Sequence, residues 1–189
     1  MLGPGALRLM REIYLEALRE KAHPISFSCG RFLYLITRAL AEARPIRAVE
    51  VGTGLGFSTL WMALGLADSG HRGVLYTIEL REQKARKAEE NLAKLGLSSY
   101  ARVLVGDAIS LLPELEGPFH LAFLDGRKDQ YARYLRLLSP KMPEGSILMA
   151  HNVISPSPHE VADFLSEVMG AGEWPVSYTH LTLPTTERV

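Results

Sequence analysis

Glycines and polar residues follow five short apolar segments of the chain, and their types suit ligand binding and proton transfer. They are Gly52, Glu79, Asp107, Asp125 and the pair His151–Asn152. The apolar segments have the length and composition of buried strands, and amphipathic helical patterns separate them. This alternation predicts an α/β fold with a doubly wound, mainly parallel sheet. Because ligands of such sheets bind beyond the carboxyl ends of the strands, the residues predict one shared site.

The elements that would position these residues follow from apolar spacing and from Gly and Pro breaks. The predicted strands are residues 47–51, 74–78, 101–105, 120–124 and 146–150. The predicted helices that follow them are residues 57–67, 81–95, 109–115, 129–138 and 158–169. Two earlier helices, 5–21 and 29–43, form an N-terminal helical extension over residues 1–44, and Ser26 or Ser28 is expected to cap the second. Residues 45–175 form the main domain.

The stretch after the first predicted strand is a glycine-rich turn of the form E-x-G-x-G-x-G, from Glu50 to Gly56. It lacks the Gly-Lys-Ser/Thr of a phosphate loop. It also lacks the third glycine of a dinucleotide fingerprint, because Phe57 stands there. The turn resembles the first motif of class I S-adenosylmethionine-dependent methyltransferases. The resemblance implies a Rossmann-like methyltransferase sheet and S-adenosylmethionine as the cofactor.

The cofactor-binding residues expected from this resemblance are Glu50, Gly52, Thr53, Gly54, Gly56, Ser58, Glu79, Asp107, Ala108 and Asp125. Glu79 follows the second strand, where an acid can accept hydrogen bonds from ribose hydroxyls. Asp107 is expected to accept from an adenine amino group, or to cap the next helix. Glu50 is expected to bind backbone N–H groups of the turn or the methionine ammonium. Ser58 is expected to bind the methionine carboxylate or to cap its helix.

A second resemblance is narrower and concerns the stretches 124–131 and 145–153. They resemble small-molecule O-methyltransferases related to the catechol and caffeoyl-CoA enzymes. In that group an acid after the fourth strand and an Asp-Asn pair after the fifth hold a divalent metal, and a lysine lies nearby. The resemblance implies a metal site of Asp125, His151 and Asn152, for magnesium or manganese, and a catalytic role for Lys128. Lys128 is expected to accept a proton if burial lowers its pKa.

His151 departs from the group's pattern, which has Asp at this position. Imidazole suits manganese, iron, cobalt or zinc better than magnesium, which prefers oxygen ligands. Alternatively, His151 is the general base of a metal-independent reaction, because an unperturbed imidazole titrates near pH 6.5. Both roles stay open at this stage.

Composition narrows the classes of protein. The 189 residues suit one domain with a sizeable core, and 47% of them are hydrophobic. The formal net charge is zero, which argues against nucleic-acid and membrane-surface partners. One cysteine permits no intramolecular disulfide, which fits the cytoplasm. No apolar run reaches transmembrane length.

The C-terminal stretch differs from the rest of the chain. Residues 176–186 resemble the translation of a transposon-based sequencing adapter, so residues 176–189 are interpreted as a non-native tail. Two antiparallel strands end the resembled fold, and they are expected to be truncated here, leaving one possible strand near 176–183.

The sequence thus predicts an S-adenosylmethionine-dependent O-methyltransferase for a small hydroxylated, catechol-like molecule, with a homodimer as one option. The alternatives are a metal-independent methyltransferase with His151 as general base, a nicotinamide-dependent oxidoreductase, a methyltransferase acting on nucleic acid or protein, and a non-catalytic scaffold.

Overall fold

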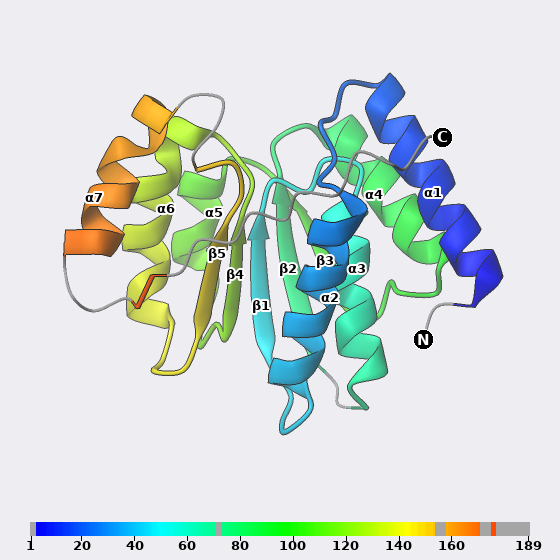
Figure 1. Cartoon of the computed structure of the whole chain (residues 1–189), viewed down its shortest axis with the longest axis horizontal. Coiled ribbons are helices and arrows are strands. Elements are labelled where there is room, and N and C mark those ends of the chain that lie inside the picture. The colour runs from blue at the N-terminus through cyan, green and yellow to red at the C-terminus, as the bar shows by residue number, and fades with distance from the viewer. Residues whose placement is uncertain (1–2, 71–72, 154–157, 171–174, 177–189) are drawn as a thin grey trace.

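The computed structural model describes residues 3–70, 73–153, 158–170 and 175–176. Five strands form one sheet: β1 (Arg47–Val51), β2 (Val74–Glu79), β3 (Ala101–Val105), β4 (Leu121–Leu124) and β5 (Ile147–Ala150). Their order is β3-β2-β1-β4-β5, and every neighbouring pair is parallel (Figure 1). The predicted doubly wound parallel sheet is confirmed.

Helices cover both faces of the sheet. They are α1 (Pro4–Arg19), α2 (Phe27–Ala41), α3 (Phe57–Asp68), α4 (Glu82–Lys94), α5 (Ala108–Glu114), α6 (Tyr131–Leu138) and α7 (Ala162–Gly170). Short 3-10 helices are η1 (Lys128–Gln130), η2 (Ser139–Lys141) and η3 (Pro158–Val161). Figure 1 shows α1–α4 on one side of the sheet and α5–α7 on the other. The helices predicted at 129–138 and 158–169 both begin as 3-10 turns.

Two apolar cores follow from the alternation of side chains along the strands. Ala48 of β1 packs into the core beneath α1–α4, whereas Val49 and Val51 pack into the core beneath α5–α7. Successive strand residues point to opposite faces, so a strand covered on both faces is apolar throughout. Two residues of β1 are charged. Arg47 begins the strand and is half-buried, whereas Glu50 is fully buried on the side of α1–α4.

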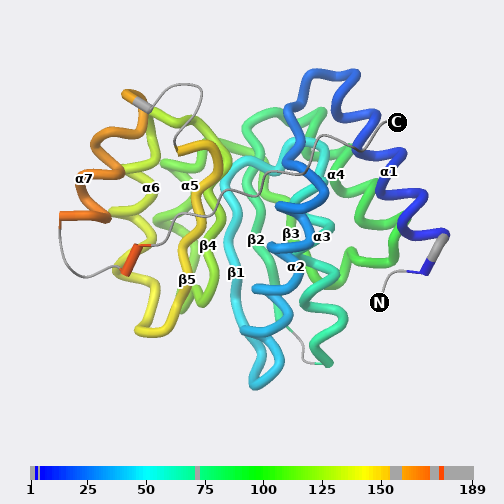
Figure 2. Tube along the Cα trace, viewed as in Figure 1, coloured from blue at the N-terminus to red at the C-terminus, as the bar shows by residue number. Residues whose placement is uncertain are grey.

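The N-terminal extension is held against α3 by small residues. A Cβ on Gly30 of α2 would overlap the indole of Trp61, and one on Gly65 of α3 would lie 2.8 Å from the carbonyl oxygen of Tyr34. The predicted cap is confirmed, since Ser26 accepts a hydrogen bond from the N–H of Cys29. This close packing carries the α1–α2 linker to the edge of the sheet where β1 ends (Figure 2).

Strand order reverses between β1 and β4, so the chain leaves these two strands in opposite directions and opens a crevice there. The strand predicted near 176–183 and the tail 177–189 lie outside the described residues. Among the described helices, none combines the length and the apolar character needed to cross a lipid bilayer.

Candidate functional site

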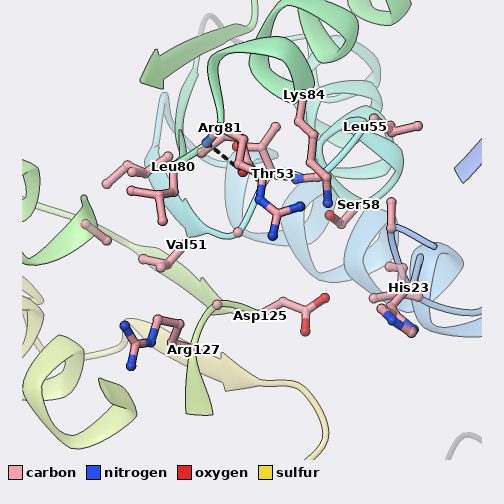
Figure 3. A pocket seen from close by; sticks show the side chains of 18 of the residues that line it. His23, Val51, Thr53, Leu55, Ser58, Leu80, Arg81, Lys84, Asp125 and Arg127 are labelled. Atoms are coloured by element: carbon pink, nitrogen blue, oxygen red, sulfur yellow. Dashed lines mark hydrogen bonds between the residues drawn. The ribbon is translucent and has the colours of Figure 1, made fainter. Parts of the chain in front are cut away.

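A cavity of about 700 Å³ lies at this reversal of strand order, and we call it the switch-point cavity. Its walls come from the carboxyl ends of β1, β2, β3 and β4 and from residues 22–25 of the α1–α2 linker. Figure 3 shows Asp125 on one side of it, His23 on the linker side, and Arg81 and Lys84 beside the start of α4. The volume lies within the range of about 300–1,000 Å³ typical of small-molecule sites.

The glycine turn forms the floor of the switch-point cavity. Gly52, Gly54 and Gly56 have φ angles of 100°, 57° and 88°. A Cβ on Gly52 would overlap the backbone carbonyl of Asp125, so only glycine lets the ends of β1 and β4 approach this closely. The residue Gly56 is the N-cap of α3, and its N–H donates to the carbonyl of Thr53. The turn therefore holds α3 with its N-terminus beside the cavity.

Glu79 at the end of β2 holds the glycine turn. One of its carboxylate oxygens accepts from the N–H of Gly54 at 2.8 Å, and the other accepts from the N–H of Arg81 at 3.0 Å. The side chain is largely buried and lines the cavity. Carboxylate oxygens have further lone pairs, so Glu79 can also accept from a ligand hydroxyl.

Glu50 lies beneath the turn and does not line the cavity. Its Oε2 accepts from the hydroxyls of Thr59 and Thr77, both at 2.6 Å, and Thr77 also bonds Thr53. Its Oε1 has no hydrogen-bond partner among the described residues. Burial raises the pKa of Glu50 to about 7, and the neighbouring hydroxyls, including that of Ser58, oppose the shift. The contacts expected with backbone N–H groups are made by Glu79 instead.

Asp107 and Ser58 lie where the sequence predicted them, at the starts of α5 and α3. The carboxylate of Asp107 caps α5 by accepting from the N–H of Ile109 at 3.3 Å, and its side chain is exposed at the cavity. Ser58 also lines the cavity and is only 6% exposed. Capping and ligand binding are compatible roles for Asp107.

The residues expected to do chemistry gather beyond β4 and β5. Asp125 Oδ1 lies 3.1 Å from Nδ1 of His151 and 3.3 Å from Nζ of Lys128. Lys128 also donates to Tyr131 Oη and, at 2.9 Å, to the carbonyl of His151. Tyr131 Oη in turn donates to the carbonyl of Leu124 at 2.8 Å. Lysine and tyrosine thus tie the end of β4 to the end of β5.

Burial lowers the pKa of Lys128, whereas the adjacent Asp125 raises it. The lowered direction is the one that the sequence interpretation of Lys128 required. However, Lys128 donates three hydrogen bonds, to Asp125, to Tyr131 and to the backbone of His151, and three donated bonds are those of an ammonium group. In this structure Lys128 fixes the position of Asp125 and of the segment carrying His151.

The residues predicted for a metal are near one another but differ in exposure. Asp125 and His151 are half-buried and in contact, whereas Asn152 is exposed and has a φ of 55°. Asn152 and Asp125 line the cavity, whereas His151 contacts Asp125 and is not itself among the lining residues. Among the described residues, no group of three or more His, Cys, Asp and Glu side chains is placed to hold a metal ion.

The switch-point cavity brings together most of the predicted cofactor residues, namely Gly52, Thr53, Gly54, Ser58, Glu79, Asp107, Ala108 and Asp125. Glu50 and Gly56 support it from beneath. The structure adds lining residues that sequence reasoning missed: His23, Leu80, Arg81, Lys84 and Tyr134. Leu80 could have been found from the sequence, because it directly follows the acid that ends the second strand. In the structure it is 63% exposed and lines the cavity.

Comparisons with known proteins agree with this geometry. The family described as "Methyltransferase domain" matches residues 49–153. A catechol O-methyltransferase from Niastella koreensis is 35% identical over 146 residues, which are 74% of this chain and 63% of that protein. A catechol O-methyltransferase from Mycobacterium tuberculosis is 36% identical over 131 residues, covering 69% of this chain and 57% of that protein. The chain thus spans about three fifths of these two relatives.

A solved structure supports the same assignment. The O-methyltransferase TomG from Streptomyces achromogenes, involved in tomaymycin synthesis and determined in complex with S-adenosylmethionine, superposes with a TM-score of 0.75 at 26% identity. The match covers 86% of this chain and 78% of that one. Fold, site and sequence together define a class I methyltransferase, and the chain belongs to the methyltransferase domain family.

Proposed function

We propose that this chain binds S-adenosylmethionine in the switch-point cavity and transfers its methyl group to a hydroxyl of a small, catechol-like molecule. The observation that carries the proposal is the Asp125–His151 pair beyond the ends of β4 and β5, in which Asp125 lines the cavity and His151 contacts it at 3.1 Å. It puts an acid–base group next to a site with the features of a nucleoside pocket. The names of the relatives support the same acceptor class.

The residues of the cavity fit this cofactor. Gly54 leaves the backbone of the turn open to a ligand, because a Cβ there would have no atom closer than the carbonyl oxygen of Ala22 at 3.9 Å. Glu79 offers carboxylate lone pairs for ribose hydroxyls, and Asp107 and the exposed Leu80 offer an acceptor and an apolar surface for an adenine ring. When bound, S-adenosylmethionine supplies a methyl group on a positively charged sulfur.

Residues of the chain must supply the other two requirements of methyl transfer. They must align an acceptor oxygen with the methyl carbon and take up the proton of the hydroxyl. With Nδ1 of His151 protonated and donating to Asp125 Oδ1, Nε2 is left as the proton acceptor. Asp125 then stabilises the imidazolium that forms, as a carboxylate does in other His-based sites. Lys128 donates hydrogen bonds to Asp125 and to the carbonyl of His151, and so fixes the positions of both residues for this transfer.

The donor set fits a divalent metal less well. Asp125, His151 and Asn152 offer one carboxylate, one imidazole and one amide, whereas magnesium prefers several oxygen ligands. The ammonium of Lys128 lies 3.3 Å from Asp125 Oδ1, the oxygen that also faces His151, and its charge opposes a cation there. We therefore propose the metal-independent reaction with His151 as general base, in preference to the magnesium or manganese site.

The experiment measures transfer of labelled methyl groups to a panel of catechols and other small hydroxylated compounds, with chelator, with magnesium or with manganese. We expect transfer in chelator and a loss of at least about 100-fold in His151→Ala. The control is His159→Ala, because His159 is exposed and does not line the cavity. Transfer that needs added metal would replace this mechanism with the metal-dependent one. Binding of S-adenosylhomocysteine without transfer to any acceptor would favour a non-catalytic scaffold.

We further infer a cytoplasmic setting, in keeping with the single cysteine, and a small-molecule partner rather than nucleic acid, in keeping with the zero net charge. A homodimer remains a prediction that sedimentation of the full chain tests.

A further inference from the structure

Two basic side chains line the switch-point cavity without an anionic partner. They are Arg81 and Lys84, at the start of α4. Within the part of the chain that the structure describes, neither forms an ion pair, although Glu79 lies in the same wall. The carboxylate of Glu79 is engaged by two backbone N–H groups instead. Among the described residues, no carboxylate therefore forms an ion pair with these two positive charges of the cavity.

Lys84 is the better placed of the two, because it is half-buried and Arg81 is exposed. It lies in the first turn of α4, one turn before Ala88, and residues four apart share a helix face. That face packs on the glycine turn, since a Cβ on Gly56 would lie 3.1 Å from the Cβ of Ala88. Lys84 therefore extends over the turn into the cavity, as Figure 3 shows.

The position of Lys84 brings no gain to its own helix. A positive charge in the first turn opposes the helix dipole. The neighbouring basic residues of α4 are used differently: Arg86 pairs with Glu82, and Lys87 pairs with Glu16. Lys84 thus lacks the structural role that these two residues have.

The groups opposite Lys84 suit an anion. Ser58 lines the cavity, is 6% exposed, and lies in the first turn of α3, where free N–H groups favour negative charge. In Figure 3 the Lys84 side chain points from α4 toward Ser58. A carboxylate between them would receive a charge-assisted hydrogen bond from the ammonium and another hydrogen bond from a free N–H group in the first turn of α3.

We propose that Lys84 binds the carboxylate of the methionyl end of the cofactor and so distinguishes ligands that carry this group. The inference rests on the proposed function, because the carboxylate is the only anionic group of S-adenosylmethionine. Ser58 and the N-terminus of α3 complete the anion site, while Glu79 holds the ribose.

The test compares two ligands that differ in the aminoacyl end. S-adenosylhomocysteine carries the carboxylate, and 5′-methylthioadenosine has the same nucleoside without it. Calorimetric titration of Lys84→Met should give about tenfold weaker binding of S-adenosylhomocysteine. The affinity of this variant for 5′-methylthioadenosine should stay within about twofold of that of the unaltered chain. Lys84→Arg should keep most of the affinity for S-adenosylhomocysteine that Lys84→Met loses. The control is Arg86→Met, which removes one positive charge from α4 outside the cavity and should leave both affinities unchanged.

Three results would overturn the inference. They are a loss of affinity in Lys84→Met that is equal for both ligands, an unchanged affinity of Lys84→Met for S-adenosylhomocysteine, and a loss of affinity in Arg86→Met equal to that in Lys84→Met. Melting temperatures of each variant separate a binding effect from a folding effect. If the unaltered chain binds neither nucleoside, the proposed function itself fails. If it binds both and Lys84→Met changes neither, only the role of Lys84 fails.

Discussion

Alanine at position 52 would need a Cβ where the backbone after β4 already lies. Gly52 has a φ of 100°, and the added atom would overlap the carbonyl of Asp125 and lie 3.0 Å from the N atom of Gly126. Backbone strain of this kind costs about 1–3 kcal/mol, and the overlap adds about 1–3 kcal/mol. We therefore expect Gly52→Ala to lower the free energy of unfolding by about 2–6 kcal/mol, or about 2–4 °C in melting temperature for each kcal/mol.

The matched control is Gly96→Ala. Gly96 also has a positive φ, 69°, but no atom lies within 4 Å of an added Cβ. Only the strain remains there, about 1–2 kcal/mol. Urea unfolding followed by circular dichroism measures both variants, and titration with S-adenosylhomocysteine measures binding. Binding should be lost in Gly52→Ala and kept in Gly96→Ala. Equal destabilisation of the two variants, with binding kept in both, would refute the close approach of β1 and β4 as the basis of the site.

Three further predictions concern single buried or cavity side chains. Glu79→Ala removes the acceptor for the N–H of Gly54 and should weaken the binding of S-adenosylhomocysteine by at least about tenfold in calorimetry. An unchanged affinity would exclude Glu79 from the nucleoside site. Burial raises the pKa of Glu50 to about 7, so its contribution to stability is complete below about pH 4 and is lost as the pH rises through 7. Relative to the unaltered chain, Glu50→Gln should therefore gain up to about 3 kcal/mol in free energy of unfolding as the pH rises from 4.5 to 8, measured by urea unfolding. If the free energies of the two proteins changed in parallel with pH, the burial of an ionisable carboxyl would be contradicted. Tyr131→Phe removes the hydroxyl that donates to the carbonyl of Leu124 and should cost about 1–3 kcal/mol, whereas no change in stability would deny it a part in joining β4 to β5.

The fold could be predicted because each segment carries a local pattern that the tertiary structure reinforces. The strands 47–51 and 101–105 were placed with the bounds that the structure has. Segments buried on both faces are apolar throughout, and the separating helices keep their periodicity. Two predicted helices begin as 3-10 turns in the structure, because a 3-10 turn such as Lys128–Gln130 has the same composition as the first turn of an α-helix.

The site could be predicted in outline, because a parallel sheet brings all carboxyl strand ends to one edge. The hydrogen-bond partner of each polar side chain could not be predicted from the sequence. Glu50 was expected to bind backbone N–H groups of the turn or the methionine ammonium. In the structure it accepts hydrogen bonds from the hydroxyls of Thr59 and Thr77, while Glu79 binds the turn. His23 and Lys84 reach the cavity from a linker and a helix start. Their spacing from the motif residues is set by packing between elements, which no local pattern records.

The measurement that tests the central claim most directly is calorimetric titration of S-adenosylhomocysteine into the unaltered full chain. The account predicts saturable binding of one ligand per chain, unaffected by chelator and abolished by Gly52→Ala, with no comparable binding of a nicotinamide dinucleotide. A chain that unfolds cooperatively but gives no binding isotherm with S-adenosylhomocysteine would contradict it.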